Sequence, residues 1–130
     1  MAWWPSITSK LSVGLMLLTP GCGVPPTRQG TFSIHAINPS EIIIESGQDQ
    51  IILEKLCFDT VEQTLIANPA IRLRVASLHE NFPLPNSVDK LIRDATGSNL
   101  ARGNYVSSIL AYCNLVKYAM NGKQKVIILS

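Results

Sequence analysis

The sequence has little charge, few aromatic residues and no long apolar segment. Of its 130 residues, 15% are charged and 6% are aromatic, whereas 46% are hydrophobic. So apolar a chain does not have the composition of a disordered protein, and its length suits one domain with an appended N-terminal segment. The 11 basic and 9 acidic residues are interspersed and leave a formal charge of +2. This balance does not by itself indicate a nucleic acid or an anionic membrane as partner.

Familiar catalytic and metal-binding motifs are also missing. The two histidines, His35 and His79, are far apart in the sequence, and no pair of cysteines has the spacing of a metal site. No glycine-rich phosphate loop precedes a helical pattern, and no Gly-x-Ser-x-Gly elbow occurs. The sequence therefore predicts no metal site and no cofactor.

The N-terminal segment differs in kind from the rest of the chain. Residues 11–19 are a mostly apolar run, too short to span a bilayer but suited to the core of a secretory signal. The small residues before Cys22 resemble the bacterial lipoprotein processing site, where the cysteine becomes the lipidated N-terminus. We therefore predict a signal peptide over residues 1–21, a lipid on Cys22, a tether over residues 22–29 and a membrane-anchored protein of the bacterial cell envelope. The alternative is an ordinary apolar helix that ends near Pro20.

The cysteines divide in agreement with this prediction. If Cys22 carries a lipid, Cys57 and Cys113 remain as a pair, and a disulfide between them would persist in an oxidising compartment. Two buried free thiols, acting as small hydrophobic side chains, are the alternative.

The strongest strand pattern lies in residues 41–59. It predicts two strands of β-branched residues around a turn at residues 46–49, with the second strand continuing through Phe58. Three further segments have strand patterns: residues 30–37, 71–75 and 125–129.

Three segments have helical patterns: residues 60–67, 87–96 and 104–120. Thr60 and Gln63 match a capping box at the start of the first helix. Ser87 is expected to cap the second, and Gly97 to close it. The third helix would turn Cys113 toward the core. Together these elements predict an α+β domain over residues 30–130, in which a small antiparallel sheet or a partial OB-like barrel is covered by two or three helices.

A family resemblance lies on residues 36–62. Gly47-Gln48 would form a hairpin tip, and Phe58-Asp59-Thr60-Val61-Glu62 would lead into a helix. Later, a helix is followed by Asn121-Gly122-Lys123. These segments resemble the first part of a staphylococcal-nuclease-like (thermonuclease) domain, with its apolar-Asp-Thr-Pro-Glu stretch and its later helix, Gly-Lys and strand. The resemblance implies an oligonucleotide-binding-type barrel and a Ca²⁺-dependent nuclease in which Asp59 and Glu62 are catalytic.

The sequence departs from that family where the chemistry lies. Residues 38–41, Asn-Pro-Ser-Glu, lack the two aspartates of the calcium turn, and Glu54 stands where the family has an arginine. Such a nuclease stabilises a pentacovalent phosphate with metal and guanidinium charge, and Glu54 reverses that charge. We therefore expect a non-catalytic binding module and keep the active nuclease as an alternative.

A second resemblance concerns residues 71–75 and the two predicted helices that follow. This order is similar to the ribbon-helix-helix DNA-binding fold, in which Arg72 and Arg74 would read bases in the major groove as part of a dimer. The other interpretation is a half-buried strand with two solvated arginines. An exported protein would meet no operator, and the sequence identifies no protein partner.

Overall fold

The computed structural model describes residues 2–20, 30–75, 85–122 and 124–130. These residues form four helices and seven strands, which follow one another as α1 (Trp3–Lys10), β1 (Met16–Leu18), β2 (Thr31–Ile37), β3 (Glu41–Ser46), β4 (Asp49–Glu54), α2 (Lys55–Ala67), β5 (Leu73–Arg74), α3 (Val88–Thr96), α4 (Gly103–Tyr112), β6 (Val116–Asn121) and β7 (Gln124–Leu129). The strands make two antiparallel sheets, ordered β1-β2-β3-β4 and β5-β7-β6. The predicted α+β class is confirmed, and the described strands form two separate sheets and no closed barrel.

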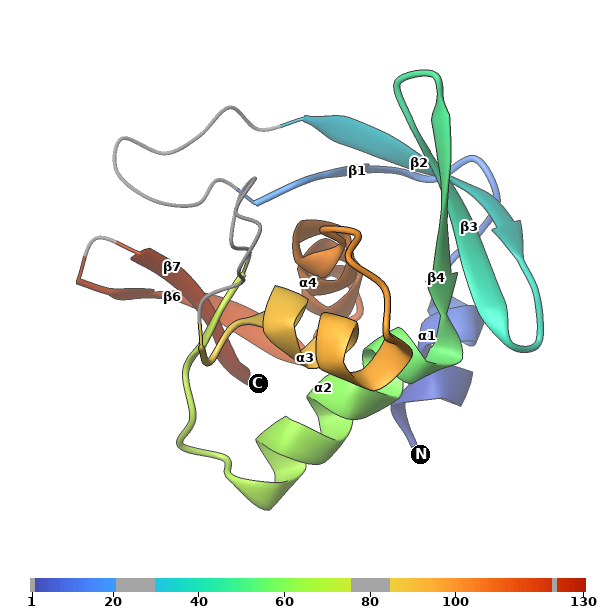
Figure 1. Cartoon of the computed structure of the whole chain (residues 1–130). Helices are drawn as coiled ribbons and strands as arrows, with labels where there is room; N and C mark the ends of the chain where they lie inside the picture. Colours follow the sequence, from blue (N-terminus) through green and yellow to red (C-terminus); the bar gives the residue numbers. More distant parts are fainter. Residues whose placement is uncertain (1, 21–29, 76–84, 123) are drawn as a thin grey trace.

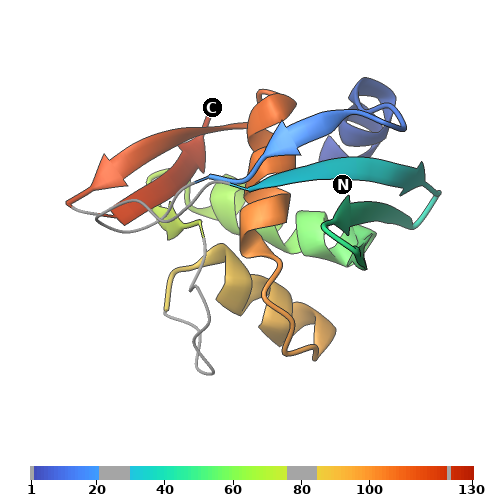
Figure 2. The same cartoon turned by 90° about the horizontal axis from the view of Figure 1, so that it is seen from above.

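Helix α4 lies in the centre of the molecule, between the two sheets (Figures 1 and 2). Its apolar stripe is fully buried at Val106, Ile109 and Leu110. Two side-chain hydrogen bonds tie it to the larger sheet: Ser108 Oγ donates to the Leu18 carbonyl (2.6 Å), and the Tyr105 hydroxyl lies 3.1 Å from Ser46 Oγ. Helices α2 and α3 pack against each other, and α3 also packs against α4; in Figure 1 both lie below α4.

The first two helical turns after β4 correct one prediction. Residues 55–58, expected to continue the second strand, begin α2, and Thr60 lies inside this helix rather than at a capping box. Strand pairing with β3 stops at Glu54. From there Phe58, Val61 and Leu65 are fully buried at helical spacing, and a strand, whose side chains alternate between two faces, could not place all three on one side.

The chain after α4 gives a second correction. Residues 116–120, expected to end the third helix, belong to β6, which pairs with β7 along its whole length. The helix ends at Tyr112, and Asn114 has a positive φ of 61°, a left-handed conformation that turns the chain away from the helix. Gly122, at φ 64°, makes the turn between β6 and β7.

Helix α3 agrees with its predicted caps. Ser87 Oγ accepts a hydrogen bond from the Lys90 amide at 3.1 Å, and Gly97 ends the helix in the left-handed region at φ 73°. Residues 30–37 and 71–75 also contain the strands expected there, β2 and the short β5. The sequence of residues 76–86, with its prolines Pro83 and Pro85, indicates a loop, and most of this segment lies outside the described residues.

Residues 2–20 are packed into the same folded body as the later elements. Trp3, Trp4, Ile7 and Leu11 are at most 8% exposed and belong to the main hydrophobic core. Strand β1 pairs with β2 and forms one edge of the larger sheet. The predicted tether, with Cys22, lies outside the described residues. Within the described ranges, no helix has the length and apolar character of a membrane span.

Candidate functional site

Glu62 stabilises the N-terminus of another helix. It lies in α2 and is 4% exposed. Its two carboxylate oxygens accept hydrogen bonds from the backbone amides of Ala2 (3.2 Å) and Trp3 (3.1 Å) at the start of α1. Ala2 itself supplies no side-chain cap. A carboxylate at a helix N-terminus satisfies unpaired amides and interacts favourably with the helix dipole. The residue expected to be catalytic in a nuclease therefore caps α1.

Asp59 has a local partner. Its Oδ2 atom lies 2.5 Å from Lys55 Nζ, one turn earlier in α2. Its Oδ1 atom is buried and has no hydrogen-bond partner among the residues that the structure describes. Asp59 and Glu62 thus lie on one helix but contact different elements, and within the described residues no group of three His, Cys, Asp or Glu side chains is arranged to hold a metal.

Cys57 and Cys113 both lie in the core as free thiols. Cys57 Sγ donates a hydrogen bond to Glu54 Oε2 at 3.2 Å. Burial raises the pKa of the Cys57 thiol to about 12 and also raises the pKa of Cys113. Both thiols are therefore protonated and poor nucleophiles at neutral pH. The disulfide remains a prediction for the oxidised protein.

Arg102 is the functional candidate that the sequence analysis missed. Its side chain is 2% exposed and donates to the Ile52 carbonyl (2.9 Å), Glu54 Oε2 (2.6 Å) and Thr96 Oγ1 (3.1 Å). The only signal for it in the sequence is isolation, since Arg102 is the one charged residue between Asp94 and Lys117.

The nuclease family has a phosphate-binding arginine at the position of Glu54. In this structure Glu54 instead binds the guanidinium of Arg102. Partial burial acts to raise the pKa of Glu54. Hydrogen bonds from its own backbone amide, Cys57 and Arg102, together with the Arg102 charge, outweigh this effect and leave the pKa below its usual value. Glu54 and Arg102 therefore form an ion pair at neutral pH, and this pair joins β4 to the segment before α4.

The two residues of this ion pair line an open groove. It has a volume of about 500 Å³ and lies between β4 and the connection from α3 to α4, which run beside each other in Figure 1. Its walls combine apolar and polar side chains from both segments: Asp49, Gln50, Ile51, Ile52, Glu54, Ser98, Leu100 and Arg102. Its volume falls within the range of ligand-binding clefts.

The connection that forms one wall of this groove is anchored at its end. The buried Asp89 carboxylate accepts a hydrogen bond from the Gly103 amide at 2.5 Å. A Cβ atom at position 103 would lie 2.6 Å from Asp89 Oδ1 and 2.7 Å from the Val75 carbonyl oxygen. Only glycine fits this close approach, which fixes where α4 begins.

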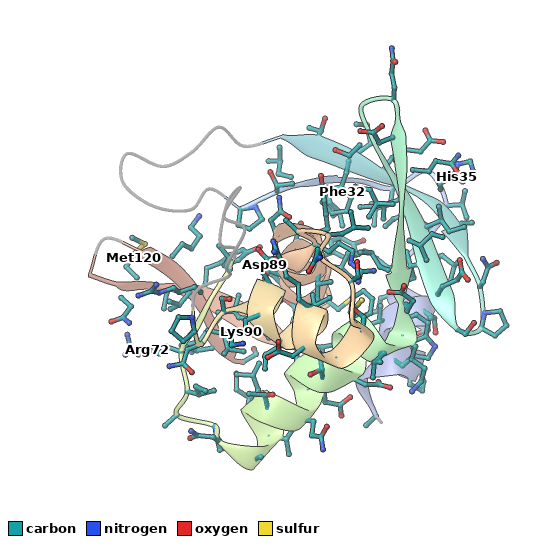
Figure 3. All side chains as sticks on the ribbon, viewed as in Figure 1. Phe32, His35, Arg72, Asp89, Lys90 and Met120 are labelled. Atoms are coloured by element: carbon teal, nitrogen blue, oxygen red, sulfur yellow. The ribbon has the colours of Figure 1, made fainter. Side chains whose placement is uncertain are left out.

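Arg72 lies on the opposite side of the molecule from His35 of β2, and Figure 3 shows it near Met120. Arg72 Nη1 lies 3.4 Å from the Met120 carbonyl oxygen, a long hydrogen bond. Strand β5, which contains Arg74, pairs with β7 of the same chain. In the ribbon-helix-helix arrangement this strand would pair with that of a second chain.

Comparison with known proteins gives no relative from which a function can be carried over. No protein-family model matches the chain, and neither a curated protein nor a solved structure is significantly similar to it.

Proposed function

We propose that the protein is a non-catalytic binding module whose binding surface is the groove between β4 and the α3–α4 connection. One observation carries this proposal: the two acidic side chains that the nuclease resemblance makes catalytic already have intramolecular partners. Glu62 caps α1 and Asp59 pairs with Lys55, whereas Glu54, at the position of the family's arginine, pairs with Arg102. The groove is a concave surface that combines exposed apolar side chains with this ordered ion pair.

A nuclease assay tests the non-catalytic part of the proposal. The full-length protein, supplied with Ca²⁺, is incubated with single-stranded DNA, duplex DNA and RNA beside a thermonuclease as positive control. We expect no cleavage. Calcium-dependent cleavage that is abolished by Asp59→Asn would refute the proposal and establish the nuclease alternative.

Export and a lipid on Cys22 remain a separate prediction, supported by the apolar run at residues 11–19. Processing before Cys22 would remove α1 and β1, together with the core side chains that they contribute. Membrane fractionation of the wild type and of Cys22→Ala, combined with the intact mass of each, tests it. A lipidated, shortened wild-type chain in the membrane fraction would support the prediction, and an unmodified full-length chain in the soluble fraction would contradict it.

The ribbon-helix-helix alternative predicts a dimer whose affinity for DNA falls steeply with salt. The pairing of β5 with β7 gives this strand a partner within its own chain instead. Analytical ultracentrifugation and a salt titration with duplex DNA distinguish the two, because a salt-sensitive dimeric complex would favour the DNA-binding alternative.

A further inference from the structure

The groove runs along the edge of a sheet rather than over one of its faces. Among the described strands, β4 is an outer strand of the larger sheet and pairs with β3 alone. The consecutive residues Asp49, Gln50, Ile51 and Ile52 all line the groove. Because successive strand side chains point to opposite faces, a groove that touches all of them lies beside the strand, where the main chain is accessible.

The strand register shows which main-chain groups face this groove. Gly47 and Gln48 form a two-residue turn, so the flanking Ser46 and Asp49 are a hydrogen-bonded pair. Along β4 the pattern alternates, and Gln50 and Ile52 therefore direct their amides and carbonyls outward. The Arg102 guanidinium, bound to the Ile52 carbonyl at 2.9 Å, confirms this direction.

Arg102 closes only one part of the edge. It occupies the Ile52 carbonyl and lies against Glu54. By the same register, the Gln50 amide and carbonyl and the Ile52 amide still point into the groove. An unpaired run of main-chain donors and acceptors is a template for another strand.

The side chains along this edge define what would bind there. Ile52 is 47% exposed and Leu100, on the facing wall, is 61% exposed, so they offer an apolar contact on each side. The hairpin over residues 41–54 contains four acidic residues and no basic one. Within the part of the chain that the structure describes, the exposed Asp49 carboxylate has no ion-pair partner.

We propose that the groove binds an extended peptide segment of a protein partner, which adds as a strand to β4 at Gln50 and Ile52. The segment places an apolar side chain against Leu100 and a lysine or arginine opposite Asp49. Main-chain hydrogen bonds supply affinity in this binding mode, and alternate side chains supply specificity. This inference rests on the proposed binding function and names the class of its partner.

Selection from a random peptide library displayed on phage, with the full-length protein as bait, tests the inference. We expect enriched peptides that alternate apolar and basic residues and contain no proline in the paired stretch. Synthetic copies of an enriched peptide should bind, and a copy N-methylated at alternate amides should bind at least about tenfold more weakly, since each methyl group removes a main-chain hydrogen bond to β4. Amide hydrogen exchange at Gln50 and Ile52 should slow when the unmethylated peptide is added.

Two variants locate the site, and a third serves as control. Asp49→Lys and Leu100→Lys should each weaken binding by about tenfold. Asp49→Lys should regain binding to a peptide whose basic residues are replaced by glutamate. Met16→Lys, at the opposite edge of the same sheet where Met16 is 64% exposed, should bind as the wild type does. All three positions are exposed, and circular dichroism verifies that each variant is folded.

The outcomes separate this inference from the proposed function. If no peptide is enriched, or if the enriched peptides bind the two groove variants as tightly as the wild type, strand addition at β4 is wrong, although the absence of cleavage in the nuclease assay would still stand. Enrichment of peptides that bind equally well after N-methylation would replace strand addition by side-chain recognition. Calcium-dependent nucleic-acid cleavage would refute the proposed function whatever the peptide result.

Discussion

Removal of residues 1–21 is predicted to unfold the protein. This truncation starts the chain at Cys22, where signal processing would start it. It removes α1 and β1, and with them four core side chains, Trp3, Trp4, Ile7 and Leu11, of which none is more than 8% exposed. It also leaves the edge of β2 unpaired and the Glu62 carboxylate without its two amide donors.

The magnitude follows from the burial of these side chains. Burying one large apolar side chain stabilises the folded state by about 1.5–3 kcal/mol, so the four together contribute about 6–12 kcal/mol as an upper estimate. A domain of this size has a total unfolding free energy of about 5–15 kcal/mol. The lost contribution is therefore comparable with the whole unfolding free energy. The loss of the two hydrogen bonds to the Glu62 carboxylate adds to it.

The tryptophans make the assay direct, because both of them, Trp3 and Trp4, lie in α1. In the full-length protein, urea unfolding followed by tryptophan fluorescence should coincide with unfolding followed by far-ultraviolet circular dichroism. Ile7→Ala should lower the unfolding free energy by about 2–5 kcal/mol, whereas Ser9→Ala, at an exposed position of the same helix, should change it by at most about 0.5 kcal/mol.

Two results would refute this reasoning. If the truncated protein shows the circular dichroism spectrum and the cooperative transition of the full chain, α1 and β1 are dispensable, and a mature protein that begins at Cys22 is physically acceptable. If the fluorescence transition precedes the circular dichroism transition, α1 detaches as a separate unit and does not belong to the cooperative core.

Three further predictions concern the core and the site. Glu62→Gln should lower the unfolding free energy by about 1–3 kcal/mol, because an amide group replaces a charged acceptor at the α1 N-terminus; unchanged urea midpoints would contradict the capping role. Gly103→Ala should lower the unfolding free energy by about 1–3 kcal/mol, because it forces a Cβ atom against Asp89. Ala101→Ser, at a nearby exposed position, serves as control. Cys57 and Cys113 should resist Ellman's reagent at pH 8 in the native protein, since burial raises both thiol pKa values, and should react after denaturation. Only one reactive thiol of the three in the denatured, unreduced protein would show that two of the cysteines are bridged, and peptide mapping would identify the pair.

The parts of the fold that the sequence predicted correctly depend on contacts between near neighbours. Ser87 and Gly97 bound α3 through a hydrogen bond to the Lys90 amide and a left-handed turn, both within one helical turn of the ends. Likewise Gly47, at φ 64°, lies between two runs of β-branched residues and makes a hairpin there. The residues that decide these features lie beside one another in the chain.

The boundaries that the sequence failed to predict depend on distant partners. Residues 55–58 are apolar enough for either a strand or a helix. They form a helix because this conformation buries Cys57 and Phe58 in a core to which other helices and strands contribute. Residues 116–120 have a helical pattern but become β6, because β7 offers a complete ladder of main-chain hydrogen bonds.

The amino-acid sequence by itself thus determined the α+β class, the local caps and the hairpin turns, because each follows from neighbouring residues. Only the tertiary structure decided how the candidate site residues are used. Glu62 meets the amides of Ala2 and Trp3 across about sixty residues of chain, and Arg102 reaches Ile52 and Glu54 across about fifty. No local sequence pattern predicts either set of hydrogen bonds, because the packing of whole helices and strands brings a buried charge to its partner. Because of that packing, Glu62 caps a helix although its sequence context resembles a catalytic site. The same packing places Arg102 beside the open edge of β4.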